Sequence, residues 1–161
     1  MNLIEDLAGE ICKIILPINE EVFFGNPKSS LAICTLSSIN LLKEIANSNL
    51  LSKVALVGRL FSENKGIDSL VRYVISNKNL ETILLCGKDT PGHRPGHSLL
   101  NLYKNGVDSQ GRIIGSSSPD PILSITKSEI LEFQNQVKLI DEIGETSISK
   151  IKLLINVIVK I

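Results

Sequence analysis

Short apolar runs alternate with longer segments of helical periodicity along most of this chain. The apolar runs predict strands at residues 21–24, 31–35, 53–58, 82–87, 112–115 and 137–140. Apolar residues that recur every three or four positions predict helices over 3–15, 37–45, 66–76, 96–105, 127–136 and from 147 onward. This alternation predicts an α/β fold with a mainly parallel sheet and helices on both of its faces.

Several helix boundaries carry signals of their own. Pro17 ends the first predicted helix, and Asn105-Gly106 is a left-handed stop for the fourth. Thr126 and Glu129 have the spacing of a capping box. No linker, repeat or low-complexity segment interrupts the pattern, so we expect a single domain over residues 1–161.

The composition of the 161 residues is ordinary for a globular protein, with 43% hydrophobic and 21% charged residues. Basic and acidic residues balance at zero net charge and Trp is absent, so no nucleic-acid partner is indicated. Cys12, Cys34 and Cys86 are scattered and odd in number, which favours free thiols in a reducing cytoplasm. The longest uncharged stretch, 29–42, is too short to span a membrane.

Familiar nucleotide and hydrolase motifs are absent from the sequence. No two glycines are separated by a single residue, which excludes the dinucleotide fingerprint. The chain also lacks the phosphate-binding G-x-x-x-x-G-K-[ST] loop and the G-x-S-x-G nucleophile turn. Ordinary nucleotide or esterase chemistry therefore explains this chain poorly.

Residues 87–121 hold six of the 11 glycines, four of the six prolines and both histidines. His93 precedes a predicted helix, whose dipole disfavours the imidazolium form and leaves a lone pair for a metal. A plain loop or capping histidine is the simpler alternative. A zinc site built from His93, His97, Asp89 and Cys86 is a weaker one, because a proline and a glycine interrupt the helical spacing of the two histidines.

Three loops are expected to meet at the carboxyl edge of the sheet, after Gly58, Gly87 and Gly115, where open α/β sheets bind ligands. In the segment 62–66, which follows the first of these strands, Asn64 either faces the site or caps a helix. The third loop holds three hydroxyl groups that suit phosphate or amide oxygens, or form an ordinary polar turn: Ser116, Ser117 and Ser118.

Many short segments, in a fixed order, resemble the A subunit of tetrahydromethanopterin S-methyltransferase. They are Gly25-Asn26-Pro27-Lys28-Ser29, Glu63-Asn64-Lys65-Gly66-Ile67, Leu84-Leu85-Cys86-Gly87, Gly92-His93 with Gly96, Asn105-Gly106-Val107-Asp108, Arg112-Ile113-Ile114-Gly115 and Phe133-Gln134-Asn135-Gln136-Val137. The resemblance covers about residues 22–144. A series of matches in order is far more specific than any one of them.

The resemblance implies a Rossmann-like domain that carries a cobamide, a cobalamin-type corrinoid. It implies that His93, in the Gly-His-x-x-Gly motif, is the axial ligand to cobalt, with His97 as its hydrogen-bonding neighbour or as a contact to a corrin amide. In that family the cobalt accepts a methyl group from methyl-tetrahydromethanopterin and passes it to the thiol of coenzyme M. The other residues expected at the cofactor are Gly92, Gly96, Thr35, Asn64, Gly66, Gly115, Ser116, Ser117 and Ser118.

We therefore expect a cobamide-binding methyl carrier, or the corrinoid-carrying subunit of a methyltransferase, rather than a stand-alone enzyme. Its expected partners are cobamide and a pterin-dependent methyltransferase subunit. Arg94 and Pro95 replace small or aliphatic residues, and His97 replaces the usual glutamine. Because no membrane anchor like that of the membrane-complex members is present, we expect a soluble relative with a different donor, acceptor or partner.

Two other functions stay open at this point. One is a corrinoid storage or sensing module that transfers no methyl group. The other is a relative that binds a different small ligand bearing a phosphate. Incubation with cobalamin distinguishes these two functions. A corrinoid protein takes up cobalamin and becomes coloured, and a protein that binds another phosphate-bearing ligand stays colourless.

Overall fold

A five-stranded sheet forms the centre of the computed structural model, which describes residues 22–160. The strands are β1 (Phe23–Phe24), β2 (Leu31–Cys34), β3 (Leu56–Gly58), β4 (Thr82–Gly87) and β5 (Lys138–Ile143). Their order in the sheet is β1-β3-β2-β4-β5. The last four are parallel, and the short β1 pairs antiparallel with β3. The α/β fold with a mainly parallel sheet is confirmed.

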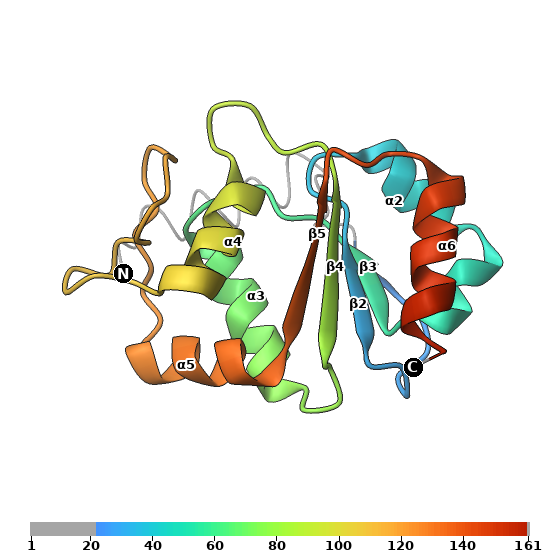
Figure 1. Ribbon diagram of the computed structural model, residues 1–161, viewed down its shortest axis with the longest axis horizontal. Helices are drawn as coiled ribbons and strands as arrows, with labels where there is room; N and C mark the ends of the chain where they lie inside the picture. Colours follow the sequence, from blue (N-terminus) through green and yellow to red (C-terminus); the bar gives the residue numbers. More distant parts are fainter. Residues whose placement is uncertain (1–21, 161) are drawn as a thin grey trace, which may run out of the picture.

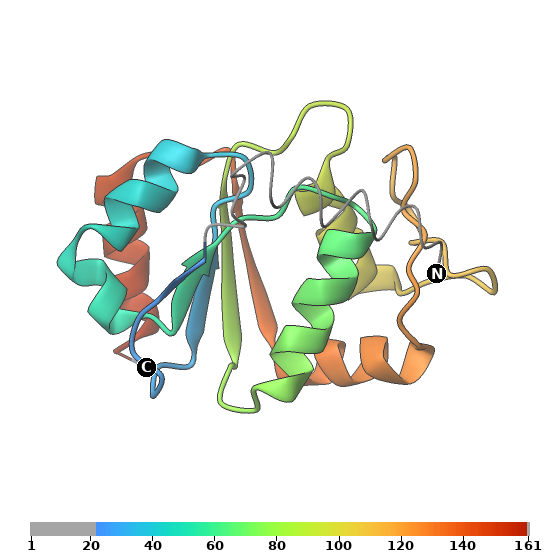
Figure 2. The same cartoon turned by 180° about the vertical axis from the view of Figure 1, so that it is seen from behind.

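Helices cover both faces of this sheet (Figure 1, and from behind in Figure 2). One face carries α3 (Lys65–Ser76), α4 (Pro95–Asn105) and α5 (Lys127–Gln136). The opposite face carries α2 (Ile39–Ala46), the short 3₁₀ helix η1 (Asn49–Lys53) and α6 (Ile148–Ile158). Parallel strands joined through helices on both faces give the Rossmann-like arrangement that the resemblance implies.

Alternation along the central strands divides the core into two layers. Leu31 and Ile33 of β2 pack toward α2 and α6, whereas Ala32 and Cys34 pack toward α3, α4 and α5. The side chains of β4 alternate in the same way. Both strands are therefore buried on both faces, which is why they stand out in the sequence as short continuous apolar runs.

Local signals set the helix ends largely where the sequence predicts them. The Thr126 hydroxyl accepts a hydrogen bond from the Glu129 amide, and the Glu129 carboxylate accepts one from the Thr126 amide, which completes the capping box. Gly106 ends α4 with a φ of 68°. Asn64 caps α3, with its side-chain oxygen 2.7 Å from the Lys65 amide.

The strand predicted at 112–115 does not form, and that prediction is wrong. Arg112 and Ile113 make only isolated bridges, to Ile122 and Val107. The glycines on either side of this short run have φ values of 81° and 87°, so the backbone turns before a strand can extend. The segment between α4 and α5 is an irregular loop outside the sheet (Figure 1), and Gly115 does not end a sheet strand.

Two further expectations from the sequence concern its first predicted helix and the lack of a membrane-spanning segment. The helix predicted at 3–15 and the thiol of Cys12 lie outside the described residues. Within residues 22–160, no helix combines the length and the apolar character that crossing a membrane requires.

Phe133 anchors α5 to the core and provides the first test. Its side chain is fully buried, and the Tyr103 ring meets it edge to face at 6.4 Å between centroids. Replacing it with alanine should lower the free energy of unfolding by about 3–5 kcal/mol, measured by urea denaturation. Leu131→Ala on the same helix removes a side chain that is 58% exposed and should change this free energy by less than about 0.5 kcal/mol. Equal effects would contradict the packing.

Candidate functional site

The carboxyl ends of the parallel strands form one edge of the sheet, where the loops after β2, β3 and β4 lie side by side (Figure 1). Backbone hydrogen bonds tie these loops together, from Thr35 to Gly58 at 2.9 Å and from Ser37 to Lys88 at 3.0 Å. A Cβ on Gly87 would lie 2.2 Å from the Thr35 carbonyl oxygen, so this close approach requires glycine.

The loop after β4 carries His93 and leads into α4. The Asp89 carboxylate caps this helix and accepts hydrogen bonds from the amides of Gly96 and His97 at 2.9 Å each. Arg94, directly before the helix, has a left-handed backbone with a φ of 45°. The cap and the turn together fix the loop on which His93 is presented.

Glu63, a buried acid in the loop after β3, pairs with His93. The imidazole Nδ1 of His93 lies 3.1 and 3.3 Å from the two carboxylate oxygens. An ionised carboxylate only accepts hydrogen bonds, so Nδ1 carries a proton, and in the neutral imidazole it is then Nε2 that keeps the lone pair. The His93 side chain is 61% exposed and that of Glu63 only 3%. The nitrogen available to a ligand is therefore Nε2.

The surroundings of Glu63 keep its buried carboxylate ionised. Burial alone raises the pKa of this carboxyl, but hydrogen bonds outweigh it and hold the pKa below its usual value. The donors are the amide of Glu63 itself, the ring of His93 and the amide of Asp120, the last at 3.2 Å. A carboxylate on one imidazole nitrogen fixes the ring and makes the other nitrogen a stronger donor to a metal.

Glu63 is the functional residue that the sequence analysis missed. The sequence feature that could have indicated Glu63 is its position in the segment 62–66. The parallel topology sets this segment beside the loop after β4. A glutamate next to a helix cap ordinarily faces solvent. Only the structure reveals that Glu63 is 2% exposed and turned toward the site.

Asn64, a predicted site residue, supports Glu63 through a third loop. Besides capping α3, its side-chain amide donates to the backbone and side-chain oxygens of Asp120 at 3.2 Å each. The Asp120 amide in turn binds Glu63. The sequence left open whether Asn64 caps a helix or faces the site. The structure shows the cap, and a contact between Asn64 and a cofactor stays a prediction.

The predicted serine run lies against α4 and not at a strand end. The buried Ser98 hydroxyl is 2.6 Å from the hydroxyls of both Ser116 and Ser118. The Arg94 guanidinium donates to the Ser117 hydroxyl at 2.8 Å. These bonds bring the run to the first turn of α4 despite the missing strand, and its contact with a ligand stays a prediction.

Thr35 and the predicted glycines Gly66 and Gly115 also have partners within the protein. Thr35 is fully buried at the end of β2, and its hydroxyl lies 3.4 Å from the Gly58 carbonyl oxygen. The Gly66 amide donates to the Ser62 hydroxyl at 2.7 Å. Gly115 has a φ of 87°, which positions the start of the serine run. Their contact with a cofactor stays a prediction.

Gly92 and Gly96, both predicted to approach a flat ligand, have different surroundings. A Cβ on Gly92 would meet nothing within 4 Å, although its φ of 81° strains any other residue. A Cβ on Gly96 would lie 2.9 Å from the Leu36 side chain, so packing inside the protein already requires this glycine. His97 places Nε2 of its ring 3.2 Å from the Asn101 amide nitrogen.

The alternative zinc site is not formed. Among residues 22–160, no three His, Cys, Asp or Glu side chains gather closely enough to hold a metal ion. Burial raises the pKa of the Cys34 thiol to about 12 and also raises that of Cys86, so neither supplies a thiolate. What remains is one imidazole nitrogen, a donor set that suits a metal already held by a macrocycle.

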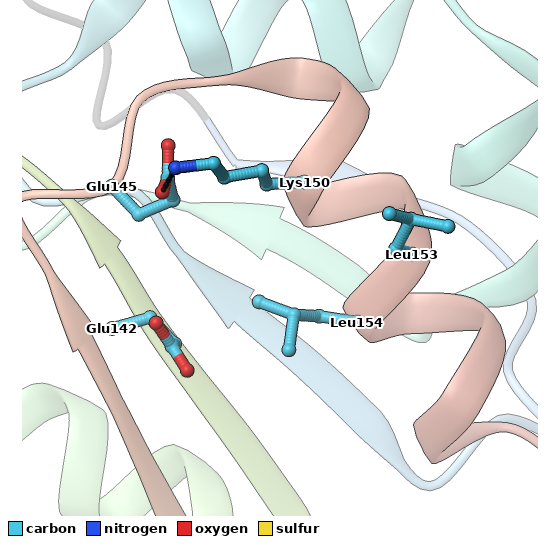
Figure 3. A pocket seen from close by; sticks show the side chains of 5 residues that line it. All are labelled: Glu142, Glu145, Lys150, Leu153 and Leu154. Carbon is cyan, nitrogen blue, oxygen red and sulfur yellow. Dashed lines mark ion pairs between the residues drawn. The ribbon is translucent and has the colours of Figure 1, made fainter.

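Two surface hollows lie away from His93. One, of about 370 Å³ between β5 and α6, is lined by Glu142, Glu145, Lys150, Leu153 and Leu154 (Figure 3). The other, of about 420 Å³ on α2, is lined by Asn40, Lys43, Glu44 and Asn47. Neither includes a residue of the three loops that meet around His93.

Glu63→Gln tests the charge of the His93–Glu63 pair. Because the pKa of folded Glu63 lies below its usual 4.5, the carboxylate stabilises the fold fully above that pH and less as pH falls through the lowered pKa. Urea denaturation should show wild type more stable by about 1–3 kcal/mol near neutral pH, with the gap closing in acid. Glu44→Gln, exposed on α2, should show no such gap. A gap independent of pH would contradict an ionised Glu63.

Comparison with known proteins identifies the family. The family model that describes the A subunit of tetrahydromethanopterin S-methyltransferase matches residues 15–160. The A subunit of the putative methyltransferase Mtx from Methanosarcina barkeri is 41% identical over 128 residues, which are 79% of this chain and 61% of that protein. The A subunit of tetrahydromethanopterin S-methyltransferase from Methanosphaera stadtmanae is 35% identical over 129 residues, 79% of this chain and 50% of that protein. The protein of the same name from Methanocaldococcus jannaschii is 32% identical over 136 residues, 83% and 55% of the two chains.

The matches extend across the part of the chain that forms the site. The family match includes both the loop of Glu63 and the loop of His93. The chain spans 50–61% of the length of these three relatives. The resemblance seen in the sequence is therefore confirmed, and this chain belongs to the family of the A subunit of tetrahydromethanopterin S-methyltransferase.

Proposed function

We propose that this chain binds a corrinoid and carries a methyl group on it, as the corrinoid-bearing subunit of a methyltransferase. The observation that carries the proposal is the His93–Glu63 pair. A buried carboxylate holds Nδ1 of an exposed imidazole, which leaves Nε2 as a fixed and strengthened ligand. In this proposal Nε2 of His93 is the axial ligand to the cobalt of a cobamide.

The loop after β4 fits a corrinoid in two further respects. The open space beside Gly92 leaves room for a broad, flat group next to His93. The buried hydroxyl of Thr90 in the same loop has no hydrogen-bond partner, and a movement of the loop that uncovers it would let it bind an amide of the ring. The residues proposed to contact the remainder of the cofactor are Gly66, Gly96, His97, Gly115, Ser116, Ser117 and Ser118, with Thr35 and Asn64 beneath them.

The residues of this chain bind and orient the cofactor. A bound corrinoid supplies a cobalt centre that can take up a methyl group and release it to a second substrate. His93 would supply a ring nitrogen to the cobalt, and the Glu63 carboxylate, which accepts the hydrogen bond from the protonated Nδ1, would fix the tautomer. Because Glu63 is buried, solvent screens its charge less than it would screen that of an exposed carboxylate.

A role within a larger enzyme is supported by the names of the relatives, each of which is the A subunit of a methyltransferase. In this proposal a separate pterin-dependent subunit delivers the methyl group. A corrinoid storage or sensing module is the second candidate, because it needs the same ligand. Methyl transfer from methylated tetrahydromethanopterin to the reconstituted protein, in the presence of the donor subunit, separates the two.

The visible spectrum of the protein reconstituted with cobalamin is the central test. Wild type should take up cobalamin and show the spectrum of a histidine-ligated cobalt. His93→Ala should lose that spectrum and keep part of the bound corrinoid, because other contacts to the ring remain. His97→Gln, which introduces the family's usual residue, should keep the spectrum. Glu63→Gln should weaken the histidine ligation about 10- to 100-fold.

Two results would overturn the proposal in different ways. If the wild-type protein stays colourless with cobalamin, corrinoid binding is excluded, and a different ligand that bears a phosphate is favoured. A spectrum that depends on His97 and not on His93 would move the ligand to the other histidine. Unfolding curves of each variant establish that the loss of a spectrum is not a loss of fold.

Gly92→Ala tests the contact between the loop and the ring, and Gly144→Ala is its matched control. Both glycines have a positive φ, 81° and 97°, and open space where a Cβ would lie. Both variants should therefore destabilise the fold similarly, by about 1–2 kcal/mol. Only Gly92→Ala should also weaken cobalamin binding, measured by titration of the visible spectrum. Equal binding by both variants would place the ring elsewhere.

A further inference from the structure

The edge of the sheet at β5 is long and open. β5 pairs with β4 on one side, and no other described strand pairs with its outer side. Figure 1 looks onto this edge, which runs between α4 and α5 on one side and α6 on the other. The opposite edge of the sheet is the two-residue β1. An unpaired edge of six residues is a ready template for another strand.

The backbone of β5 determines which groups such a strand would meet. The amides of Lys138 and Gly144, at even positions, point inward to Glu81 and Gly87 of the neighbouring segment at 2.8 Å. Because backbone groups alternate along a strand, the odd positions 139, 141 and 143 point outward. The amide of Ile143 is already bound to the Asp141 side chain at 3.1 Å. Leu139 and Asp141 therefore offer the free outward groups.

The charges on β5 are complementary to a second copy of the same strand. In an antiparallel pair with its two-fold axis at Ile140, Leu139 faces Asp141 of the second copy, and each such pair exchanges both backbone hydrogen bonds. The same register sets Lys138 opposite Glu142 of the second copy, in the pairing where side chains approach closest. Neither charge has an ion pair within the part of the chain that the structure describes.

The register with its axis one residue later, at Asp141, is less favourable. With the axis at Asp141, the two Asp141 carboxylates would face each other, and like charges directly opposite are destabilising. That register would also use the amide of Ile143, which Asp141 already occupies. Charge and hydrogen bonding thus favour the axis at Ile140.

The helix beside this edge adds apolar surface on the side of the charged pairs. Ile140 packs against the core layer that contains Ile151 and Ile155 of α6, so the even positions of β5 face that side of the sheet. Glu142 shares the hollow of Figure 3 with Leu154, which points from α6 toward it, and with Leu153. Leu153 is 66% exposed, and Val157, one turn later, is 61% exposed. Exposed leucine and valine on one helix face are typical of an interface.

We infer that this chain forms a symmetric dimer in which the β5 strands of two copies pair antiparallel about Ile140. Lys138 of each copy enters the hollow of the other and pairs with Glu142. The two sheets then form one continuous sheet, and the α6 helices adjoin across the axis. We assign a second copy of this chain to the β5 edge because two copies match each other there. In the register about Ile140, opposite charges face each other and the free backbone groups of the two strands pair.

Sedimentation velocity over a concentration series tests the dimer. The wild-type chain should show a concentration-dependent monomer–dimer equilibrium. A symmetric dimer contains two pairs between positions 138 and 142. Lys138→Glu and Glu142→Lys each give like charges at both pairs, so each should raise the dimer dissociation constant at least about tenfold. An equal mixture of the two variants restores opposite charges at every pair and should form a heterodimer about as tight as wild type. Lys43→Glu, exposed on α2, should have no effect.

Amide hydrogen exchange locates the interface independently. Exchange at Leu139 and Asp141 should slow as the wild-type concentration rises, and should not slow in Lys138→Glu. A chain that stays monomeric at every concentration overturns the inference, even if a strand from another protein later binds this edge. A dimer that both charge reversals leave unchanged, or that leaves exchange at these amides unaltered, overturns it as well. Circular dichroism establishes that the variants are folded.

Discussion

A buried negative charge at the carboxyl edge of the sheet is the constraint on which the site depends. Removing the Glu63 carboxylate from water is costly unless hydrogen bonds replace those of the solvent. The replacements come from its own amide, from Asp120 and from His93, so three separate loops must be in place before the charge is tolerated. The geometry around His93 is therefore tied to the fold, and it does not rest on the properties of one loop alone.

The order of the strands explains why these loops can meet. β2 lies between β3 and β4, so Glu63 after β3 and His93 after β4 approach each other above the end of β2. The chain leaves β2 toward α2 on one face and leaves β3 and β4 toward α3 and α4 on the other (Figure 2). Such a switch point is where open α/β sheets ordinarily bind ligands. Leu36, directly after the end of β2, has a left-handed backbone with a φ of 52°.

Features set by local sequence could be predicted, and those set by distant contacts could not. The apolar runs of β2 and β4, the Thr126 capping box and the Gly106 stop depend on neighbours in the chain. The run at 112–115 has the composition of a strand, but the glycines beside it have positive φ values that turn the backbone, and the run lies outside the sheet. The burial of Glu63 depends on Asp120, 57 residues later, which no local pattern encodes. His93 was singled out because glycine, proline and both histidines concentrate in its segment, and its role as a ligand stays a prediction.

The site and the β5 edge use different boundaries of one sheet, which allows both to operate together. Strand pairing uses the lateral groups at positions 139 and 141, whereas His93 and Glu63 lie beyond the strand ends. The ends of β4 and β5 are also joined to each other, by the Gly144 amide on the Gly87 carbonyl at 2.8 Å and by the Gly87 amide on the Glu145 carbonyl at 2.8 Å. A second copy at β5 therefore extends the sheet sideways and leaves the carboxyl edge uncovered. The proposed function requires that freedom, because a donor and an acceptor would have to reach the carried group in turn.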